Sequence, residues 1–235
     1  MVILKKGLVV SCQATEDEPM FGSEIMAKMA LAAQMGGAVG VRVNTYSDLV
    51  AVRKAVDIPI LGLIKTVHPG FWPYITTTME DVDKVVESGA EIVCIDATFY
   101  PRFDGNDFPT FYKLVRERHP NVEIMADIST FEEGIRADKL GCDYVSTTLW
   151  GYTPDTVDEG SGLIQELREP NVELVGQLAK VCKAPIVAEG RFFNSENAIK
   201  AFKAGAHAVV IGAGITRPQI ITKKIVDDIK REIDL

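Results

Sequence analysis

The sequence lacks features that define several whole classes of protein. No stretch approaches the roughly 20 consecutive apolar residues that a membrane-spanning helix needs. The N-terminal run MVILKKGLVVSCQ has two lysines before a short apolar stretch and no small-residue cleavage site, so we expect no secretory signal peptide. Basic residues are outnumbered, 25 against 33 acidic, and the net charge is -8. We therefore expect neither a nucleic-acid-binding nor a membrane-binding surface.

Cysteine is sparse, and no C-x-x-C pair is present. The four cysteines lie far apart, at Cys12, Cys94, Cys142 and Cys182, and three of them fall inside apolar runs. This pattern favours buried, reduced thiols and a cytoplasmic location. Cys12 lies at the end of an apolar run, so a catalytic role for it stays open as an alternative.

Histidine is also scarce, and the first turn lacks glycine. His68, His119 and His207 fall outside the positions where the apolar runs end, which disfavours a metal site. His68 is either a solvated loop residue, which we favour, or close enough to Lys65 to reach the same site. The segment from Gln13 to Glu16 carries no G-x-G-x-x-G pattern, so we expect no nicotinamide cofactor.

Eight short apolar runs alternate with longer amphipathic segments, which is typical of repeated strand–helix units. A closed (β/α)8 barrel, a single domain spanning 1–235, is the fold that we predict, and an open doubly wound sheet is the alternative. The predicted strands cover 8–13, 37–43, 59–65, 91–97, 123–129, 144–149, 185–190 and 208–214.

Periodic apolar positions predict eight helices between and after these strands. They cover 24–34, 47–55, 79–88, 108–118, 131–139, 172–182, 195–203 and 218–233. Ser47, Ser195 and the Arg217–Pro218 pair suit helix starts, and Gly89, Gly141 and Gly205 suit positions just beyond helix ends.

Polar residues end seven of the eight predicted strands. The residues at the ends are Gln13, Arg42, Lys65, Asp96, Asp127, Thr148, Glu189 and Gly212. In a barrel these positions share one mouth, at the carboxyl ends of the strands, where such enzymes carry their chemistry. The plainer interpretation is that strand ends are polar because they meet water, but it explains poorly why charged residues follow strongly apolar ones.

The loops after the seventh and eighth strands read A-E-G-R, at 188–191, and G-A-G-I-T-R-P, at 212–218. Glycine lets the backbone approach a ligand closely, and backbone N–H groups at a helix start attract an anion. In (β/α)8 barrels these two loops are the recurring phosphate site. Arg191 and Arg217 add positive charge there, so we predict a phosphate site.

Lys65 and Glu189 are the candidate catalytic pair. In one enclosed mouth, burial lowers the pKa of an amine and raises that of a carboxyl group, which suits proton abstraction next to a carbonyl. Two alternatives stay open: a structural salt bridge between the two residues, and a Schiff base on Lys65 as in lysine-dependent aldolases.

Over nearly its full length the chain resembles the N-acetylmannosamine-6-phosphate 2-epimerase family. The matching motifs are S-C-Q (11–13), G-V-R (40–42), G-L-I-K (62–65), P-Y-I-T-T-T-M (73–79), D-A-T (96–98), M-A-D-I-S-T (125–130), V-S-T-T-L (145–149), G-Y-T (151–153), A-E-G (188–190) and G-A-G-I-T-R-P (212–218). Several short motifs in the right order are far more specific than any one of them.

The resemblance implies epimerisation at C2 of N-acetylmannosamine 6-phosphate, a step in sialic acid use, without an organic cofactor or metal. It implies Lys65 and Glu189 as the catalytic pair. It implies substrate contacts from Gln13, Arg42, Tyr74, Asp127 and Thr148, and a phosphate cradle of Gly190, Arg191, Gly212, Gly214 and Arg217. A sugar-phosphate sensor without catalysis is the non-enzyme alternative.

The chain departs from the family pattern in a few places. Phe99–Tyr100–Pro101–Arg102 follows D-A-T, Phe192–Phe193 follows A-E-G-R, and Trp150 precedes G-Y-T. The segment 151–170 exceeds an ordinary barrel connection, so it is either a lid over the sugar or a surface insertion. The apolar last helix predicts a homodimer, although a helix that merely covers the barrel has the same pattern.

Overall fold

Residues 3–157 and 167–233 are described in the structure, a computed structural model. Within them, parallel strands close into a barrel in the order β1 to β8, and β8 pairs with β1 through Val210 and Val9. The closed order excludes the open doubly wound sheet. The strands are β1 (Gly7–Cys12), β2 (Gly40–Asn44), β3 (Ile60–Leu63), β4 (Ile92–Asp96), β5 (Glu123–Asp127), β6 (Tyr144–Ser146), β7 (Ile186–Ala188) and β8 (Ala208–Ile211).

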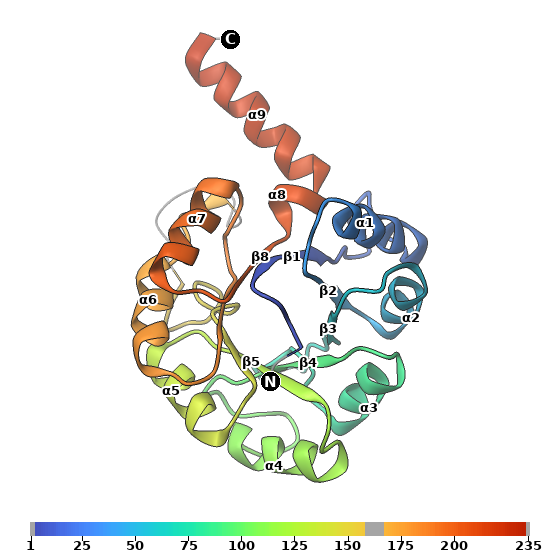
Figure 1. The fold of residues 1–235 in the computed structure, drawn as a ribbon, viewed down its shortest axis with the longest axis vertical. Helices are drawn as coiled ribbons and strands as arrows, with labels where there is room; N and C mark the ends of the chain where they lie inside the picture. Colours follow the sequence, from blue (N-terminus) through green and yellow to red (C-terminus); the bar gives the residue numbers. More distant parts are fainter. Residues whose placement is uncertain (1–2, 158–166, 234–235) are drawn as a thin grey trace.

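Helices surround the barrel, one after each of the first seven strands (Figure 1). They are α1 (Ser23–Met35), α2 (Tyr46–Ala55), α3 (Met79–Glu87), α4 (Phe108–Arg118), α5 (Phe131–Leu140), α6 (Val172–Val181) and α7 (Ser195–Ala204). The eighth strand is followed by a single turn, α8 (Ala213–Thr216), and by α9 (Pro218–Ile233). The sequence predicted α9 with its bounds but missed α8.

One of the predicted helix starts needs correction: α2 begins at Tyr46, one residue before Ser47, whereas Ser195 and Pro218 begin α7 and α9 as predicted. Thr45 caps α2 through a bond from the Asp48 backbone N–H, and Asn194 caps α7 through one from the Asn197 N–H. Each cap directly precedes the first helical residue, where its side-chain oxygen satisfies an N–H that the first turn leaves unbonded. The predicted glycines are confirmed: Gly141 and Gly205 end α5 and α7 in the left-handed conformation.

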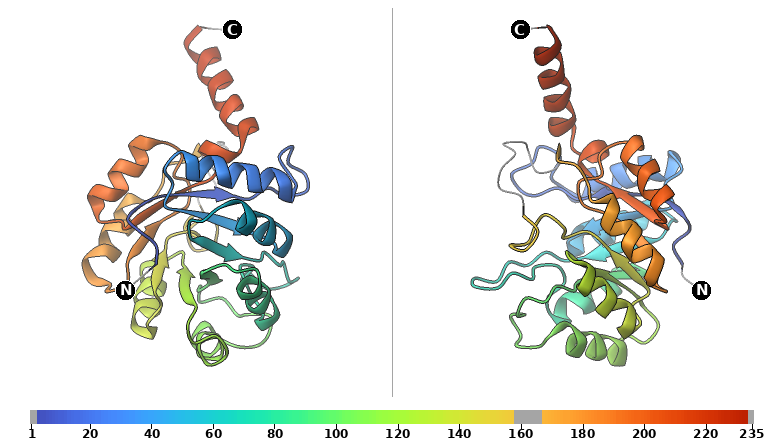
Figure 2. Two further views of the ribbon diagram at one scale, coloured as in Figure 1. Left: turned by 45° about the vertical axis from the view of Figure 1, so that its right-hand side comes forward. Right: turned by 90° about the vertical axis from the view of Figure 1, so that its left-hand side faces the viewer.

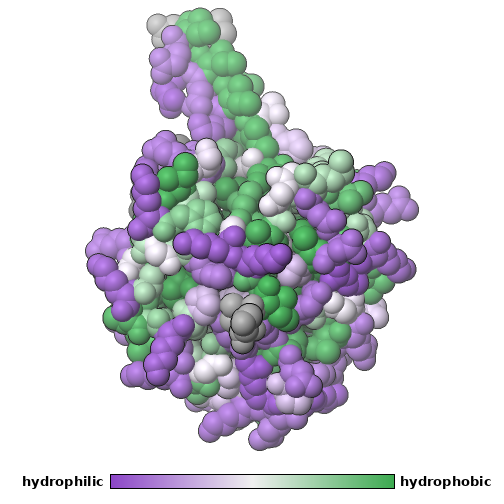
Figure 3. All heavy atoms as spheres, viewed as in Figure 1, coloured by the Kyte–Doolittle hydropathy of each residue, from purple (hydrophilic) through white to green (hydrophobic). Residues whose placement is uncertain are grey.

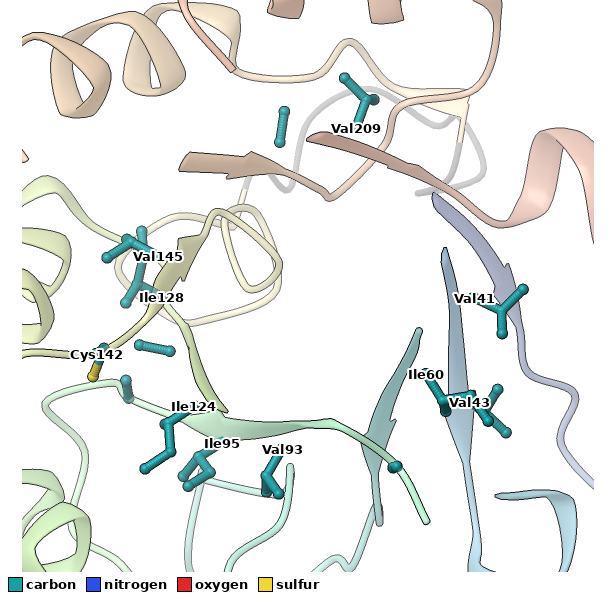
Figure 4. Packing of buried hydrophobic residues seen from close by; sticks show 14 of the residues in the cluster. Val41, Val43, Ile60, Val93, Ile95, Ile124, Ile128, Cys142, Val145 and Val209 are labelled. Atoms are coloured by element: carbon teal, nitrogen blue, oxygen red, sulfur yellow. The ribbon is translucent and has the colours of Figure 1, made fainter. Parts of the chain in front are cut away.

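Alternate residues of each strand face opposite sides, and this divides the apolar core into two layers. One layer fills the space between barrel and helices. Figure 4 shows part of it, including Val41, Ile60, Val93 and Val145. The other layer fills the barrel interior and comprises Leu4, Val9, Leu61, Leu63, Ile75, Ile92, Cys94, Met125, Tyr144, Leu149, Val187, Ala208 and Val210.

The N-terminal segment closes the end of the barrel opposite the mouth. Leu4 is 1% exposed, and its backbone N–H donates to the Tyr144 hydroxyl at 3.0 Å. Its carbonyl lies 2.7 Å from the His207 ring nitrogen Nε2. The Tyr144 hydroxyl in turn donates to Glu123 at 2.6 Å. Access to the interior is therefore left to the mouth, where the loops after β3 and β6 extend on the same side (Figure 2).

The last helix, α9, stands away from the barrel (Figures 1 and 2). None of its described residues is buried. Its apolar side chains form a stripe along one side of the helix (Figure 3), and Ile225, Val226, Ile229 and Ile233 are 40–62% exposed. Among the described residues, none of the helices combines the length and apolar composition needed to cross a membrane.

Candidate active site

A cavity of about 240 Å³ opens at the mouth of the barrel. It is lined by Ser11, Gln13, Arg42, Lys65, Tyr74, Ile75, Thr148, Tyr152, Glu189, Gly190, Arg191, Phe192, Val210, Gly212, Ala213, Thr216 and Arg217. Ten of the twelve predicted site residues belong to this lining, and only Asp127 and Gly214 do not. For Lys65 and Glu189 the alternating pattern explains the position, because each lies two residues beyond an interior side chain, Leu63 or Val187, and faces the same way.

Arg42 is the buried cation at the base of the cavity and is 1% exposed. Its Nη1 and Nη2 donate to the two carboxylate oxygens of Asp127 at 3.0 and 2.7 Å. Nη1 also lies 2.9 Å from Oε2 of Glu189. A two-pronged guanidinium–carboxylate pair is among the strongest hydrogen-bonded contacts in proteins, so Arg42 fixes both carboxylates relative to each other.

Thr148 links the same two carboxylates from a neighbouring strand end. Its hydroxyl lies 2.6 Å from Asp127 Oδ1 and 3.1 Å from Glu189 Oε2. A hydroxyl has one proton, so it donates to one carboxylate at a time. Asp127 is fully buried below the lining. Its contact with the cavity therefore runs through Arg42 and Thr148.

Glu189 is anchored to the end of β6 as well as to Arg42. The Thr147 hydroxyl donates to the Glu189 carbonyl at 2.8 Å and accepts from the Glu189 backbone N–H at 3.1 Å. Burial raises the pKa of the Glu189 carboxyl, and the Arg42 guanidinium opposes that rise. Its carboxylate is thus held in place while retaining a raised affinity for a proton.

Lys65 projects into the same cavity from the end of β3. Its backbone N–H donates to the Asn44 side chain at 2.9 Å. The side chain is exposed to the cavity, and desolvation by the surrounding walls lowers the pKa of its amine to about 8, with a further contribution from nearby Arg42. Within residues 3–157 and 167–233, Lys65 forms no ion pair and Glu189 pairs with Arg42. The structural salt bridge considered as an alternative is therefore absent from this part of the chain.

Tyr74 reaches the cavity on the loop that follows β3. That loop folds back, with a backbone bridge between Lys65 and Ile75 and a bond from the Thr66 N–H to the Tyr74 carbonyl at 2.9 Å. The Asp96 carboxylate accepts from the Tyr74 N–H at 3.2 Å. Burial raises the pKa of the Tyr74 hydroxyl, and nearby carboxylates raise it further. Tyr74 therefore stays a neutral hydrogen-bonding group.

Backbone N–H groups converge where the sequence predicts a phosphate. Gly190 and Arg191 have φ angles of 91° and 65°, which turn the chain sharply after β7. In the described part of the chain, the N–H groups of Gly190, Phe192, Gly212 and Ala213 have no hydrogen-bond acceptor, and all four residues line the cavity. Because N–H groups in folded proteins are rarely left unpaired, this cluster suits an anion.

Glycine at 214 has a packing role. A Cβ atom there would collide with the backbone carbonyl of Phe193, so only glycine lets α8 pack against the loop after β7. Gly212 allows a similarly close approach to Ser11, where a Cβ would lie 3.2 Å from the serine Cβ. Arg217 lines the cavity and pairs with Glu18 at 2.9 Å.

Gln13 lines the cavity and has a side-chain acceptor without a partner among the described residues. Its amide nitrogen donates to the Ser11 hydroxyl at 2.8 Å, whereas its Oε1 is buried without a partner among the described residues. Such an oxygen suits a bound hydroxyl or amide N–H, since a buried unpaired acceptor is costly.

Three residues considered from the sequence lie outside the lining. The Asp96 carboxylate, whose pKa burial raises to about 6, binds Thr98 and the Tyr74 N–H. His68 lies 3.0 Å from the Thr77 hydroxyl and stacks on Phe103, so it is not simply a solvated loop residue. Cys12 is fully buried, and burial raises the pKa of its thiol to about 12, which disfavours a reactive thiolate.

Several lining residues were not predicted. Ser11 precedes Gln13 by two positions on β1, so the alternating pattern was the signal that marks it. Tyr152 lies in the G-Y-T motif, which was noted without a role for the tyrosine. Of the long segment 151–170, residues 158–166 lie outside the described residues. Among the described residues, no group of three or more His, Cys, Asp or Glu side chains is placed to hold a metal ion.

Comparison with known proteins gives a consistent result. Residues 26–231 match the NanE family model, described as "Putative N-acetylmannosamine-6-phosphate epimerase". Two proteins named "Putative N-acetylmannosamine-6-phosphate 2-epimerase" are similar over nearly the whole chain. The one from Caldanaerobacter subterraneus is 52% identical, covering 97% of this chain and 92% of its own length. The one from Staphylococcus haemolyticus is 42% identical, covering 98% and 100%.

Solved structures agree with the sequence comparison. The N-acetylmannosamine-6-phosphate 2-epimerase from Clostridium perfringens superposes with a TM-score of 0.86 at 40% identity, covering 96% of this chain and 94% of that one. The thiamine phosphate pyrophosphorylase from Pyrococcus furiosus, at 19% identity and a TM-score of 0.59, shares the fold alone. The chain therefore belongs to the NanE family of N-acetylmannosamine-6-phosphate epimerases and is an isomerase.

Proposed function

We propose that the protein interconverts N-acetylmannosamine 6-phosphate and N-acetylglucosamine 6-phosphate by moving the proton at C2. The observation that carries this proposal is that Lys65, with its pKa lowered to about 8, and Glu189, with its pKa raised, line one cavity. An acid and a base whose pKa values are both shifted toward neutrality suit proton transfer near neutral pH.

In the proposed reaction the sugar reacts in its open form, in which the C1 aldehyde acidifies the C2 proton. One member of the pair removes that proton, leaving an enolate, and the other returns a proton to the opposite face of C2. One proton leaves and one arrives, so no redox partner is consumed.

We assign the 6-phosphate to the loops after β7 and β8. The unpaired N–H groups at Gly190, Phe192, Gly212 and Ala213 support this assignment, and Arg191 and Arg217 add positive charge to the same wall. Gly214 contributes by letting α8 approach the loop after β7.

The remaining polar lining is proposed to hold the sugar. Gln13 offers its unpaired Oε1, and Tyr74 offers its neutral hydroxyl. Arg42 and Thr148 line the cavity directly, while Asp127 acts by fixing them. We further propose that the reaction belongs to the breakdown of sialic acid and related amino sugars and takes place in the cytoplasm. The cytoplasmic location accords with the free thiols of the four cysteines.

We also propose a homodimer in which a second copy covers the apolar side of α9. Ile225, Ile229 and Ile233 are 54, 43 and 62% exposed in the single chain. An apolar stripe on a helix that contacts little of its own barrel is a typical protein–protein interface.

The test is exchange of the C2 proton in D2O, followed by NMR with N-acetylmannosamine 6-phosphate. We expect deuterium at C2 and appearance of the epimer with the wild-type protein. Lys65→Met and Glu189→Gln keep the side-chain volumes and should abolish both. Lys54→Ala and Glu117→Ala alter exposed residues and should leave both unchanged.

Two other outcomes would overturn the proposal. Trapping of a substrate adduct on Lys65 by borohydride would indicate a lysine-dependent aldolase. Binding of the sugar phosphate by a folded protein, with neither exchange nor epimer, would indicate a sensor.

A further inference from the structure

Arg191 occupies a backbone conformation that L-residues seldom adopt. Its φ angle is 65°, directly after Gly190 at 91°. A non-glycine residue in the left-handed region costs on the order of 1–2 kcal/mol, so the surrounding contacts must favour it.

Those contacts come from the loop after β6. The Arg191 guanidinium is buried and donates to the Gly151 carbonyl at 2.8 Å. Its centre lies 4.9 Å from the Trp150 ring and 5.6 Å from the Tyr152 ring. A Cβ on Gly151 would collide with the guanidinium. Residues 150–152 thus wrap around this one side chain.

The same two loops are joined at a second point. Thr147 binds both the N–H and the carbonyl of Glu189. A Cβ on Gly190 would lie 3.2 Å from the Thr148 carbonyl, so the backbones pack closely. Tyr152, whose ring lies 5.6 Å from the guanidinium, lines the cavity. Arg191 therefore connects the loop after β7 to this tyrosine.

We propose that the Arg191 guanidinium is a positioning residue, which holds Tyr152 in the cavity wall so that the tyrosine contacts the bound sugar. The proposal rests on the proposed function and deepens it, since the Arg191 main chain and the neighbouring N–H groups remain the phosphate site. A lysine at 191 keeps the positive charge but has no planar face to stack on the two rings.

The kinetic test is a double-mutant cycle between Arg191→Lys and Tyr152→Ala. In the wild-type background, Arg191→Lys should lower kcat/KM about tenfold, through KM, because a displaced Tyr152 weakens sugar binding. In the Tyr152→Ala background, the same change should alter kcat/KM less than about twofold. An equal loss in both backgrounds would show that Arg191 acts without Tyr152 and would overturn the proposal.

A folding defect caused by Arg191→Lys can be distinguished from displacement of Tyr152. A smaller fraction of folded enzyme lowers kcat and leaves KM unchanged. A loss confined to kcat would therefore also count against the proposal. Inhibition by inorganic phosphate should be the same in the wild type and in Arg191→Lys, since the amide cradle is intact. A weakened inhibition would assign the guanidinium to the phosphate instead.

A second measurement needs no enzyme activity. The chain has two tryptophans, so Trp72→Phe leaves Trp150 as the single reporter. In that background, Arg191→Lys should increase quenching of Trp150 fluorescence by acrylamide, because the ring loses the cation packed against it. Unchanged quenching would contradict the described packing. This readout remains interpretable even if C2 exchange fails, so the two proposals can fail separately.

Discussion

Arg42 sets the charge balance of the cavity. By pairing with both Asp127 and Glu189, it engages the carboxylate that would otherwise attract the Lys65 amine. Desolvation in the mouth and the adjacent guanidinium lower the Lys65 pKa, and the Glu189 carboxylate opposes them only in part. The arrangement keeps a proton donor and a proton acceptor in one cavity without letting them neutralise each other.

This balance predicts a bell-shaped dependence of kcat/KM on pH. Epimerisation by a pair requires one protonated and one unprotonated member, which here means charged Lys65 and ionised Glu189. As pH rises through about 8, Lys65 loses its proton and no donor remains. As pH falls through the raised pKa of Glu189, both members are protonated and no base remains. We expect the alkaline limb near pH 8.

The alkaline limb is the diagnostic part of this profile. The substrate phosphate titrates near pH 6, roughly, and so contributes to the acidic limb. Measuring kcat/KM from pH 5 to 10 at constant ionic strength resolves the two limbs. A rate that stays level up to pH 10 would contradict the assignment of Lys65 to proton transfer.

The positions of site residues were predictable at strand ends, because side chains along a strand point alternately to its two sides. Lys65 and Glu189 follow interior side chains by two positions, so their place in the mouth follows from the pattern. The burial of Asp127 below the lining depends on Arg42, which lies 85 residues away in the chain. The wrapping of Arg191 by residues 150–152 likewise depends on two loops meeting, which no local pattern encodes.

At the scale of elements, helix positions were predicted closely and strand ends less so. The last predicted strand runs to residue 214, but β8 stops at Ile211 because the chain turns there into α8. The apolar run continues past the strand, since these residues still pack in the mouth. An apolar pattern alone does not mark where the ladder of hydrogen bonds ends.

The exposed apolar side of α9 leads to a prediction about the oligomeric state. Replacing Ile225 and Ile229 with Glu should convert the proposed dimer to a monomer, because two charges would then be buried in an apolar interface. Light scattering coupled to size-exclusion chromatography measures the change. Glu232→Lys also alters charge on an exposed part of α9 and should leave the dimer intact.

A wild-type protein that elutes as a monomer at micromolar concentration would contradict the dimer. The sequence alone does not distinguish the two roles of this helix. Its amphipathic pattern suits a helix that covers the barrel equally well, and only the structure shows it standing away.

At the scale of the whole molecule, the site draws on both ends of the chain. Gln13 lies on the first unit and Arg217 on the last, and the β1–β8 pairing brings them together. The closed barrel was predictable from eight alternating units, because eight parallel strands, each followed by a helix, are the number that closes this barrel. A ligand bound in the cavity should therefore stabilise the whole barrel against unfolding.

We predict that inorganic phosphate raises the melting temperature. At a concentration 100 times its Kd, a ligand adds about 2.7 kcal/mol, which corresponds to roughly 5–10 °C for a chain of this size. Arg217→Gln should lose most of this shift. Glu18→Gln removes the partner of Arg217 but keeps its guanidinium, so it should retain the shift. Equal shifts in the two variants, measured by calorimetry, would contradict the phosphate assignment.

The pairing of β8 with β1 also determines when the active site can form during synthesis of the chain. The phosphate loops lie in the last two units, and the eighth strand closes the barrel only when residues 208–211 can pair with β1. A chain whose residues from 208 onward are still inside the ribosome therefore has Lys65 but no completed cavity around it. We expect translation to yield no active intermediate until residues 208–217 have left the ribosome and folded against β1.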